Sequence, residues 1–167
     1  MRFSLRVATP QDASKVSGLL QRSYSVLLRE AYDADLLAKA LPFISVARPE
    51  LLSSGTYYLV ETAAGRIIGA GGWTRQSPTG RTESVNTGNI RHFGTDPEFA
   101  RQGAGRLLMK TCLQEAAGAG LTALNCYSTL NGAAFYASFG FETIGSFKVE
   151  LPGSVMFPSV RMVKTLS

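Results

Sequence analysis

Two glycines, Gly103 and Gly105, lie in the part of this sequence that most constrains the fold. The segment 89–110 around them predicts a strand, then a basic glycine-rich turn, then a helix. In that order the unpaired backbone N–H groups and the positive dipole end of the helix face the turn. The first expectation is therefore a binding site for a phosphate-bearing ligand.

Glycine in the interior of a helix weakens the helix, so both glycines need another explanation. At the start of a helix, the missing Cβ lets the backbone come close to pyrophosphate oxygens. Donors and positive charge around the same turn come from Arg101, Gln102 and Arg106. The alternative is an ordinary helix start with small residues for tight packing, which a lone G-x-G also permits.

Two better-known phosphate loops fit this turn poorly. A Walker A loop requires Gly-Lys-Ser/Thr, but Gly105 is followed by Arg106 and Leu107. A dinucleotide fingerprint requires a third glycine where Leu108 stands, and an acidic residue near Asn125. Neither is present, so these two nucleotide sites are not predicted.

The turn does resemble the acyl-CoA pyrophosphate loop of the GNAT superfamily of N-acetyltransferases, whose pattern is R/Q-x-x-G-x-G/A. Aligned on the glycines, Ala100 takes the first position, and Arg101 beside it is expected to substitute. A second segment, 131–141, resembles the family's N-x-x-A-x-x-F/Y-Y-x-x-x-G-F, with one residue fewer after Asn131. The resemblance implies acetyl-CoA as cosubstrate, and implies the following cofactor-binding residues: Phe93, Gly94, Thr95, Arg101, Gln102, Gly103, Ala104, Gly105, Arg106, Asn131 and Tyr136.

Length and composition suit one compact domain over residues 1–167. The chain is 45% hydrophobic, and none of its apolar stretches is long enough to span a membrane. Residues 1–7 alternate like a strand and lack the pattern of a secretion signal, so we expect a cytoplasmic protein. A homodimer is left open.

Charge and cysteine content exclude further classes. Cys112 and Cys126 are expected to be buried hydrophobes, because one histidine and two cysteines are too few to complete a metal site. The net charge of +5 is spread along the chain and suits an anionic cofactor. Without a Lys/Arg-rich run, binding to nucleic acid is not expected.

The order of elements predicts an α/β fold of the α+β type: a mixed, twisted central sheet of about seven strands, with helices on both faces. This matches the GNAT fold over nearly the whole chain. Strands are expected at 3–8, 56–61, 66–73, 89–95, 121–128, 141–151 and 160–166. Helices are expected from Pro10 to about Glu30, over 33–41 and 49–53, after Gly105 and after Asn131. Gly71-Gly72 inside a strand suggests a bulge or a close backbone approach.

In GNAT enzymes the strands corresponding to 89–95 and 121–128 part, and the pantetheine arm of the cofactor lies between them like an extra strand. Gly94 and Pro97 would end regular pairing here, leaving backbone groups from Phe93 to Thr95 for ligand. The alternative is a simple strand end.

The reaction that the resemblance implies is direct transfer of acetyl from acetyl-CoA to an amine. A fixed backbone N–H would stabilise the oxyanion. Tyr136 matches the family's general-acid tyrosine, which protonates the CoA thiolate; a core tyrosine is the alternative. Asn131 would contact the pantetheine amide, and could also cap the helix that it begins.

The residue that takes the amine proton is not settled by the sequence. The family's strand-borne glutamate would fall near Asn89, which cannot accept a proton at neutral pH. His92 is the only histidine and lies on this strand, although a lone strand histidine is often structural. Glu83 in the polar loop and a water chain are the other candidates.

Three function classes follow. The first is an N-acetyltransferase acting on a primary amine of a small molecule or peptide. The second is an inactive acyl-CoA sensor, and the third is a regulatory protein acetyltransferase. Segments 31–55, 76–88 and 152–158 should form the acceptor cleft, but nothing in them identifies the acceptor.

Overall fold

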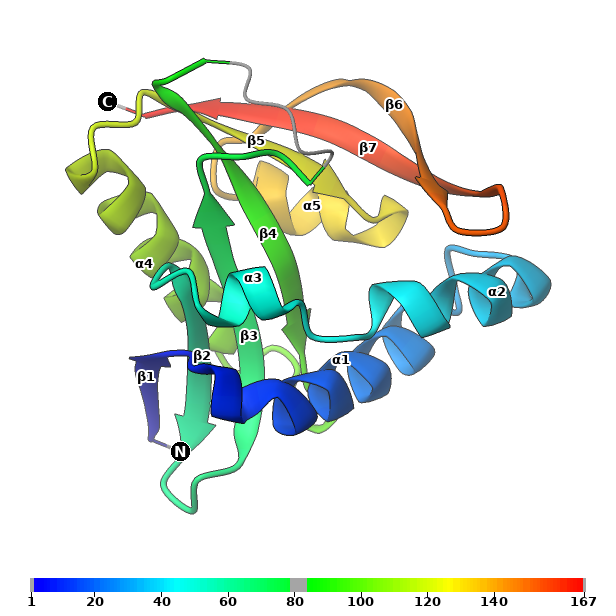
Figure 1. Cartoon of the computed structure of the whole chain (residues 1–167), viewed down its shortest axis with the longest axis horizontal. Coiled ribbons are helices and arrows are strands. Elements are labelled where there is room, and N and C mark those ends of the chain that lie inside the picture. The colour runs from blue at the N-terminus through cyan, green and yellow to red at the C-terminus, as the bar shows by residue number, and fades with distance from the viewer. Residues whose placement is uncertain (1, 79–83, 167) are drawn as a thin grey trace.

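The strands form one seven-stranded mixed sheet, seen in the computed structural model of Figure 1, which describes residues 2–78 and 84–166. The strand order is β1-β2-β3-β4-β5-β7-β6. All neighbours are antiparallel except β4 and β5. The strands are β1 (Phe3–Val7), β2 (Tyr57–Thr62), β3 (Ile67–Thr74), β4 (Thr87–Thr95), β5 (Ala123–Ser128), β6 (Glu142–Leu151) and β7 (Val155–Thr165).

Helices cover both faces of this sheet, which confirms the predicted fold class. The helices are α1 (Ala13–Leu27), α2 (Ala34–Ile44), α3 (Pro49–Leu52), α4 (Ala104–Gly118) and α5 (Ala133–Ala137). Short 3-10 turns precede three of them: η1 (Pro10–Asp12), η2 (Pro97–Phe99) and η3 (Leu130–Gly132). No helix in the described ranges combines the length and the apolar character that a bilayer crossing needs.

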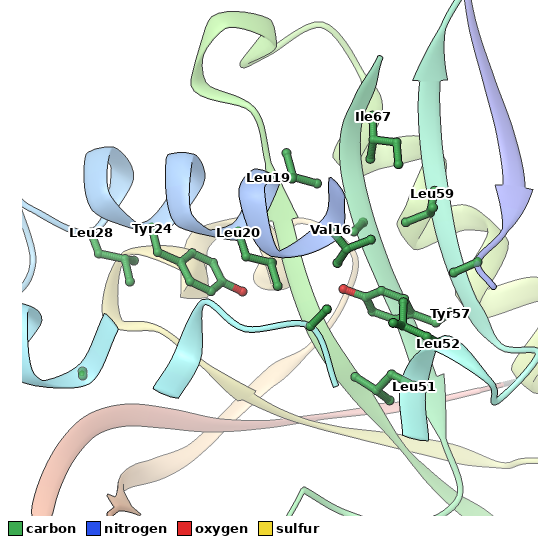
Figure 2. Packing of buried hydrophobic residues seen from close by; sticks show 14 of the residues in the cluster. Val16, Leu19, Leu20, Tyr24, Leu28, Leu51, Leu52, Tyr57, Leu59 and Ile67 are labelled. Atoms are coloured by element: carbon green, nitrogen blue, oxygen red, sulfur yellow. The ribbon is translucent and has the colours of Figure 1, made fainter. Parts of the chain in front are cut away.

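Two hydrophobic cores hold the helices to the sheet. The first packs α1, α2 and α3 against one face, and Figure 2 shows its centre, where Val16, Leu19 and Leu20 of α1 meet Tyr57 and Leu59 of β2. The second packs α4 and α5 against the other face around fully buried side chains such as Leu108 and Met109. Cys112 and Cys126 are free and buried in this second core, as expected. The apolar faces of the helices are thus buried on both sides of one sheet.

The parallel pair β4 and β5 parts soon after it forms. Pairing is limited to three residues, from Thr87↔Ala123 to Asn89↔Asn125. Beyond Asn89, β4 continues to Thr95 without a β5 partner, and the two ribbons diverge plainly in Figure 1. The predicted separation of these strands is therefore present. Two of the backbone groups expected to be left for ligand, the Phe93 carbonyl oxygen and the Thr95 N–H, are instead hydrogen-bonded to Tyr24 and Ser23 of α1.

A bulge shapes β4 just where the strands part. The register of β3 and β4 shifts between the pairs Gly72↔Arg91 and Ala70↔Gly94, so two residues of β4 oppose one of β3. His92 takes a left-handed φ of 51° in this bulge. A Cβ at Gly71 would lie 2.6 Å from the Phe93 ring, which explains why glycine stands there. The bulge suggested by Gly71-Gly72 is confirmed.

The last hairpin differs from expectation. Residues 152–158 were predicted to be a loop, but β7 begins at Val155, and the turn is only Pro152 to Ser154. Gly153 and Ser154 both have left-handed φ, as a tight hairpin requires. Pro158 is tolerated within β7 because β7 has there run past the end of β5, whose pairing stops at Val160↔Ser128.

Candidate active site

A cavity of about 730 Å³ occupies the gap between β4 and β5. Its walls come from α1, the segment after α2, the β4 bulge, the start of α4, α5 and the β6–β7 hairpin. Of the predicted site residues, the cavity is lined by His92, Phe93, Gly94, Thr95, Arg101, Gly103, Ala104, Gly105, Arg106, Asn131 and Tyr136. Gln102 is exposed and does not line it. Ser23, Tyr24 and Leu27 of α1 thus meet residues of both predicted motifs in one cavity, although they lie far from those motifs in sequence.

The turn before α4 has the geometry of an anion site at one end of this cavity. Arg101 and Gly103 have left-handed φ values of 62° and 96°, which fold the chain tightly ahead of the helix. Gly103 is the N-cap residue, and no side chain caps α4. The N–H groups of the first helical turn therefore remain for an outside acceptor. Arg101 and Arg106 add positive charge, so the residues present fit a pyrophosphate.

Gly105 supplies space rather than conformational freedom. A Cβ at this position would lie 3.2 Å from the Phe135 ring of α5, which is tighter than ordinary contact. The glycine lets α4 approach α5 closely below the cavity. Tight packing, the alternative explanation, therefore applies at Gly105. Ligand approach stays a prediction for Gly103, where an added Cβ would meet nothing within 4 Å.

Asp96 fixes the turn between β4 and α4, a role that the sequence did not reveal. It is 1% exposed, forms ion pairs with Arg22 at 3.3 Å and Arg66 at 2.8 Å, and accepts a hydrogen bond from the Glu98 N–H. These donors lower the pKa of Asp96 even though burial opposes that shift by raising it. The carboxylate thereby holds the turn between β4 and α4 in place.

Helix α1 contributes groups to the β4 backbone that sequence patterns did not predict. The Tyr24 hydroxyl donates to the Phe93 carbonyl oxygen at 2.5 Å, and the Thr95 N–H donates to Ser23 Oγ at 3.3 Å. Tyr57 donates likewise to the His92 carbonyl oxygen at 2.8 Å. In Figure 2 the Tyr24 and Tyr57 hydroxyls point toward one another. Ser23 on an otherwise apolar helix face was the only sequence signal of these contacts.

Tyr136 lies in the wall of the cavity with its ring packed among aromatics. The ring contacts Phe93 edge-on with centroids 6.0 Å apart, and Phe141 at 5.8 Å. Its hydroxyl lies beside the Cys126 thiol, which adds to the effect of burial on the phenol. Burial raises the pKa of Tyr136 well above 10, so the phenol keeps its proton at neutral pH. Unlike the Tyr24 hydroxyl, it does not donate to a backbone carbonyl of the described chain.

His92 is held in a way that weakens it as a base. Its Nε2 lies 2.7 Å from the Ile44 carbonyl oxygen, which only accepts, so Nε2 carries the proton. The other nitrogen, Nδ1, is buried and has no partner among the described residues. Burial lowers the pKa of His92 to about 4. The ring thus ties the bulge to the end of α2, and its lone pair is shielded.

The remaining candidates have other contacts. Asn131 donates to the Leu27 carbonyl oxygen at 2.6 Å and caps neither η3 nor α5, so the predicted cap is wrong. The asparagine instead joins η3 to the end of α1, which competes with capping. Asn89 is buried and donates to the Arg75 carbonyl oxygen at 3.3 Å. Glu83 lies outside the described residues.

Comparisons with known proteins agree with this geometry. A family model described as an acetyltransferase (GNAT) domain matches residues 29–165. The chain belongs to the GNAT acetyltransferase family. No significant match to a curated protein sequence was found.

Solved GNAT structures resemble the whole chain at low sequence identity. A GCN5-related N-acetyltransferase from Rhodopseudomonas palustris has a TM-score of 0.77 at 19% identity, with 99% of both chains covered. The PaiA N-acetyltransferase from Thermoplasma acidophilum, solved with coenzyme A, has a TM-score of 0.72 at 15% identity, again over 99% of both chains. The ribosomal-protein-S18-alanine N-acetyltransferase of Escherichia coli has a TM-score of 0.66 at 14% identity, over 99% of this chain and 95% of the other. At these identities the likeness establishes the fold.

Proposed function

We propose that this GNAT protein transfers an acetyl group from acetyl-CoA to a primary amine by direct attack. The observation that carries the proposal is the single cavity between β4 and β5, which joins the anion-binding turn of α4 to the Tyr136 hydroxyl. Family membership and the coenzyme A bound to the Thermoplasma acidophilum structure support an acyl-CoA cosubstrate.

Binding would use both ends of the gap. The first-turn N–H groups of α4, with Arg101 and Arg106, would hold the pyrophosphate. The pantetheine arm would lie between β4 and β5, where the two strands no longer pair. The carbonyl oxygen of Phe93 already accepts from the Tyr24 hydroxyl, and the Thr95 N–H donates to Ser23 Oγ. These contacts keep β4 in position before the cofactor arrives, which lowers the cost of ordering the site.

The transfer itself requires stabilisation of an oxyanion and protonation of a thiolate. The amine nitrogen attacks the thioester carbonyl carbon, and a backbone N–H of the β4 bulge stabilises the oxyanion, a contribution of about 10²–10³ in rate. The C–S bond then breaks, and the thiolate takes the Tyr136 proton. Burial raises the pKa of the neighbouring Cys126 thiol to about 12, and it raises the pKa of Tyr136 in the same direction. A CoA thiolate leaving in these surroundings would be strongly basic and would need a proton donor.

Water, rather than His92, is proposed to take the amine proton. A histidine with a pKa of about 4 and a shielded Nδ1 competes poorly with solvent that enters the cavity. The structure offers no carboxylate among the described residues that line the cavity. A water chain needs only the connection between the cavity and bulk solvent.

Release of free CoA from acetyl-CoA, assayed with a panel of amines, amino acids and peptides, tests the proposal. We expect acceptor-dependent release for at least one class. If acetyl-CoA binds by calorimetric titration but no acceptor stimulates release, the protein is the inactive sensor instead. If acetyl-CoA does not bind, the cofactor proposal fails. Preference for peptide acceptors would favour the regulatory protein acetyltransferase.

A further inference from the structure

Two arginines, Arg48 and Arg91, line the cavity outside the turn before α4. Arg91 directly precedes the β4 bulge, and Arg48 is the residue before α3. Besides burial, the charge of Arg48 lowers the pKa of both Arg91 and His92, so the three side chains lie near one another in the cavity wall. Neither arginine belongs to the motifs that resemble the cofactor site.

Arg91 is a buried cation without a counter-charge in the described chain. It is 8% exposed, and its one hydrogen bond runs from Nη1 to Thr74 Oγ1 at 2.9 Å. No carboxylate within residues 2–78 and 84–166 forms an ion pair with it. Burial, and then the charge of Arg48, lower the pKa of Arg91, whereas Glu50 and Tyr57 act in the opposite direction. An arginine held in this way has several N–H donors and a charge that an anion would compensate.

Acidic residues are absent from the cavity walls in the described part of the chain. Glu50, whose charge acts on both Arg91 and His92, has a side chain that is 59% exposed on α3 and lies 3.9 Å from Arg48, and it is not part of the lining. A polyamine or a lysine-rich peptide would therefore bring its second positive charge toward Arg48 and Arg91 with nothing to pair it. Like charges placed this way disfavour binding.

We propose that the acceptor is a small amine that also carries a carboxylate, as a free amino acid does, with the carboxylate bound by Arg91 and Arg48. This inference rests on the proposed acetyl transfer. A planar guanidinium binds a carboxylate through two parallel hydrogen bonds, which gives direction as well as charge. Because Arg91 adjoins the bulge at His92, an acceptor anchored there presents its amine toward the β4 backbone that would hold the thioester.

Matched acceptors test this assignment. Each L-amino acid in a panel is assayed beside its own carboxamide for acetyl-CoA-dependent CoA release. We expect kcat/KM for the best amino acid to exceed that of its carboxamide by about 10-fold or more. Aminoalkylphosphonates form a third arm, and a preference for them would assign the same anion site to phosphonate rather than carboxylate, which overturns the carboxylate assignment.

Variants identify the residues responsible. Two single substitutions, Arg91→Gln and Arg48→Gln, should each lower the ratio of kcat/KM for the amino acid to kcat/KM for its carboxamide. The change should come chiefly from a higher KM for the amino acid. Arg29→Gln, an exposed arginine outside the cavity, should leave that ratio unchanged. If Arg91→Gln does not fold, Arg48→Gln still decides the question.

The failure of this inference differs from that of the proposed function. The anionic acceptor would be overturned if carboxamides or polyamines were acetylated as well as amino acids and if the ratio of amino acid to carboxamide were unchanged in both variants. The proposed acetyl transfer would then still stand. No CoA release with any amine would instead overturn the proposed function, and this inference with it.

Discussion

Burial decides what the individual side chains of this site can do. Tyr136 and His92 both line the cavity, but burial keeps the phenol protonated and keeps the imidazole neutral. One is therefore suited to give a proton, and the other is poorly suited to take one. The sequence named both residues but could not separate their roles, because that separation depends on how deeply the fold buries each ring.

Removing the Tyr136 hydroxyl should damage turnover more than binding. Tyr136→Phe keeps the ring packed against Phe93 and Phe141, so stability and acetyl-CoA affinity should change little. We expect kcat to fall by about 10²-fold, measured as steady-state CoA release. Tyr127→Phe, a second tyrosine in the cavity wall, is the control. Full kcat in Tyr136→Phe, or an equal loss in both variants, would return Tyr136 to a packing role.

His92 should control stability below neutral pH. Its pKa is lowered to about 4 in the folded protein, against about 6.5 when unfolded, so below pH 6.5 the unfolded chain binds the proton more readily. The free energy of unfolding should therefore fall between pH 7 and pH 5, by about 1–2 kcal/mol from this group. Urea unfolding at the two pH values measures the loss.

The same histidine gives a kinetic test. In His92→Gln the free energy of unfolding should fall less between pH 7 and pH 5 than it does in the wild type, because His92 is the chain's only histidine. Its kcat/KM should change less than about tenfold, with the pH profile retained, since water takes the amine proton. Loss of an ionisation from the profile, with a 100-fold or greater fall in rate, would restore His92 as the base.

At the scale of elements, the turn between β4 and α4 is the proposed binding site for the pyrophosphate, and the β3–β4 bulge sets the direction of the β4 backbone beside the cavity. The motif that begins α4 was predictable because its conformational demand is local: a left-handed residue and uncapped N–H groups. The groups that α1 adds, Ser23 and Tyr24, come from contacts about 70 residues apart, and local patterns carry almost no trace of them.

A negative charge introduced at position 103 should weaken the binding of acetyl-CoA. Space is available there, since nothing lies within 4 Å of an added Cβ, but the φ of 96° is strained for any side chain. Gly103→Asn and Gly103→Asp share this strain, and the aspartate is also favoured at a helix N-terminus. The Gly103→Asp protein should thus be at least as stable as the Gly103→Asn protein. It should nevertheless bind acetyl-CoA about 10-fold more weakly, as measured by calorimetric titration. Equal affinities would remove the pyrophosphate from this turn.

Gly71 should prove essential to the bulge. In Gly71→Ala the new methyl group would meet the Phe93 ring at 2.6 Å, and displacing the ring should cost about 1–3 kcal/mol. Gly18→Ala in α1 meets only Arg22 Nη1 at 3.4 Å and should gain stability, because alanine favours helix. Unfolding by urea compares the two. A Gly71→Ala protein as stable as the wild type would show that Phe93 is not held tightly.

At the scale of the molecule, one twisted sheet carries two cores and opens between its parallel strands. The order of strands and helices followed from periodicity and from the GNAT resemblance, and the residues of the cofactor end gather as expected, Gln102 excepted. The β7 start was missed because Pro158 normally ends a strand, and only the short β5 beside it makes the proline acceptable. Arg91 was missed for a related reason, since an arginine in a strand signals nothing until burial and missing counter-charge are seen.

Acetyl transfer in this cavity would convert acetyl-CoA and an amine into equal amounts of free CoA and N-acetylated product. It is tested most directly by one reaction in which these two products are quantified together, by thiol assay and mass spectrometry. We expect equal amounts of the two, both dependent on the acceptor and both reduced in Gly103→Asp relative to Gly103→Asn. CoA released without an equal amount of N-acetylated amine, or no release with any acceptor, would contradict it.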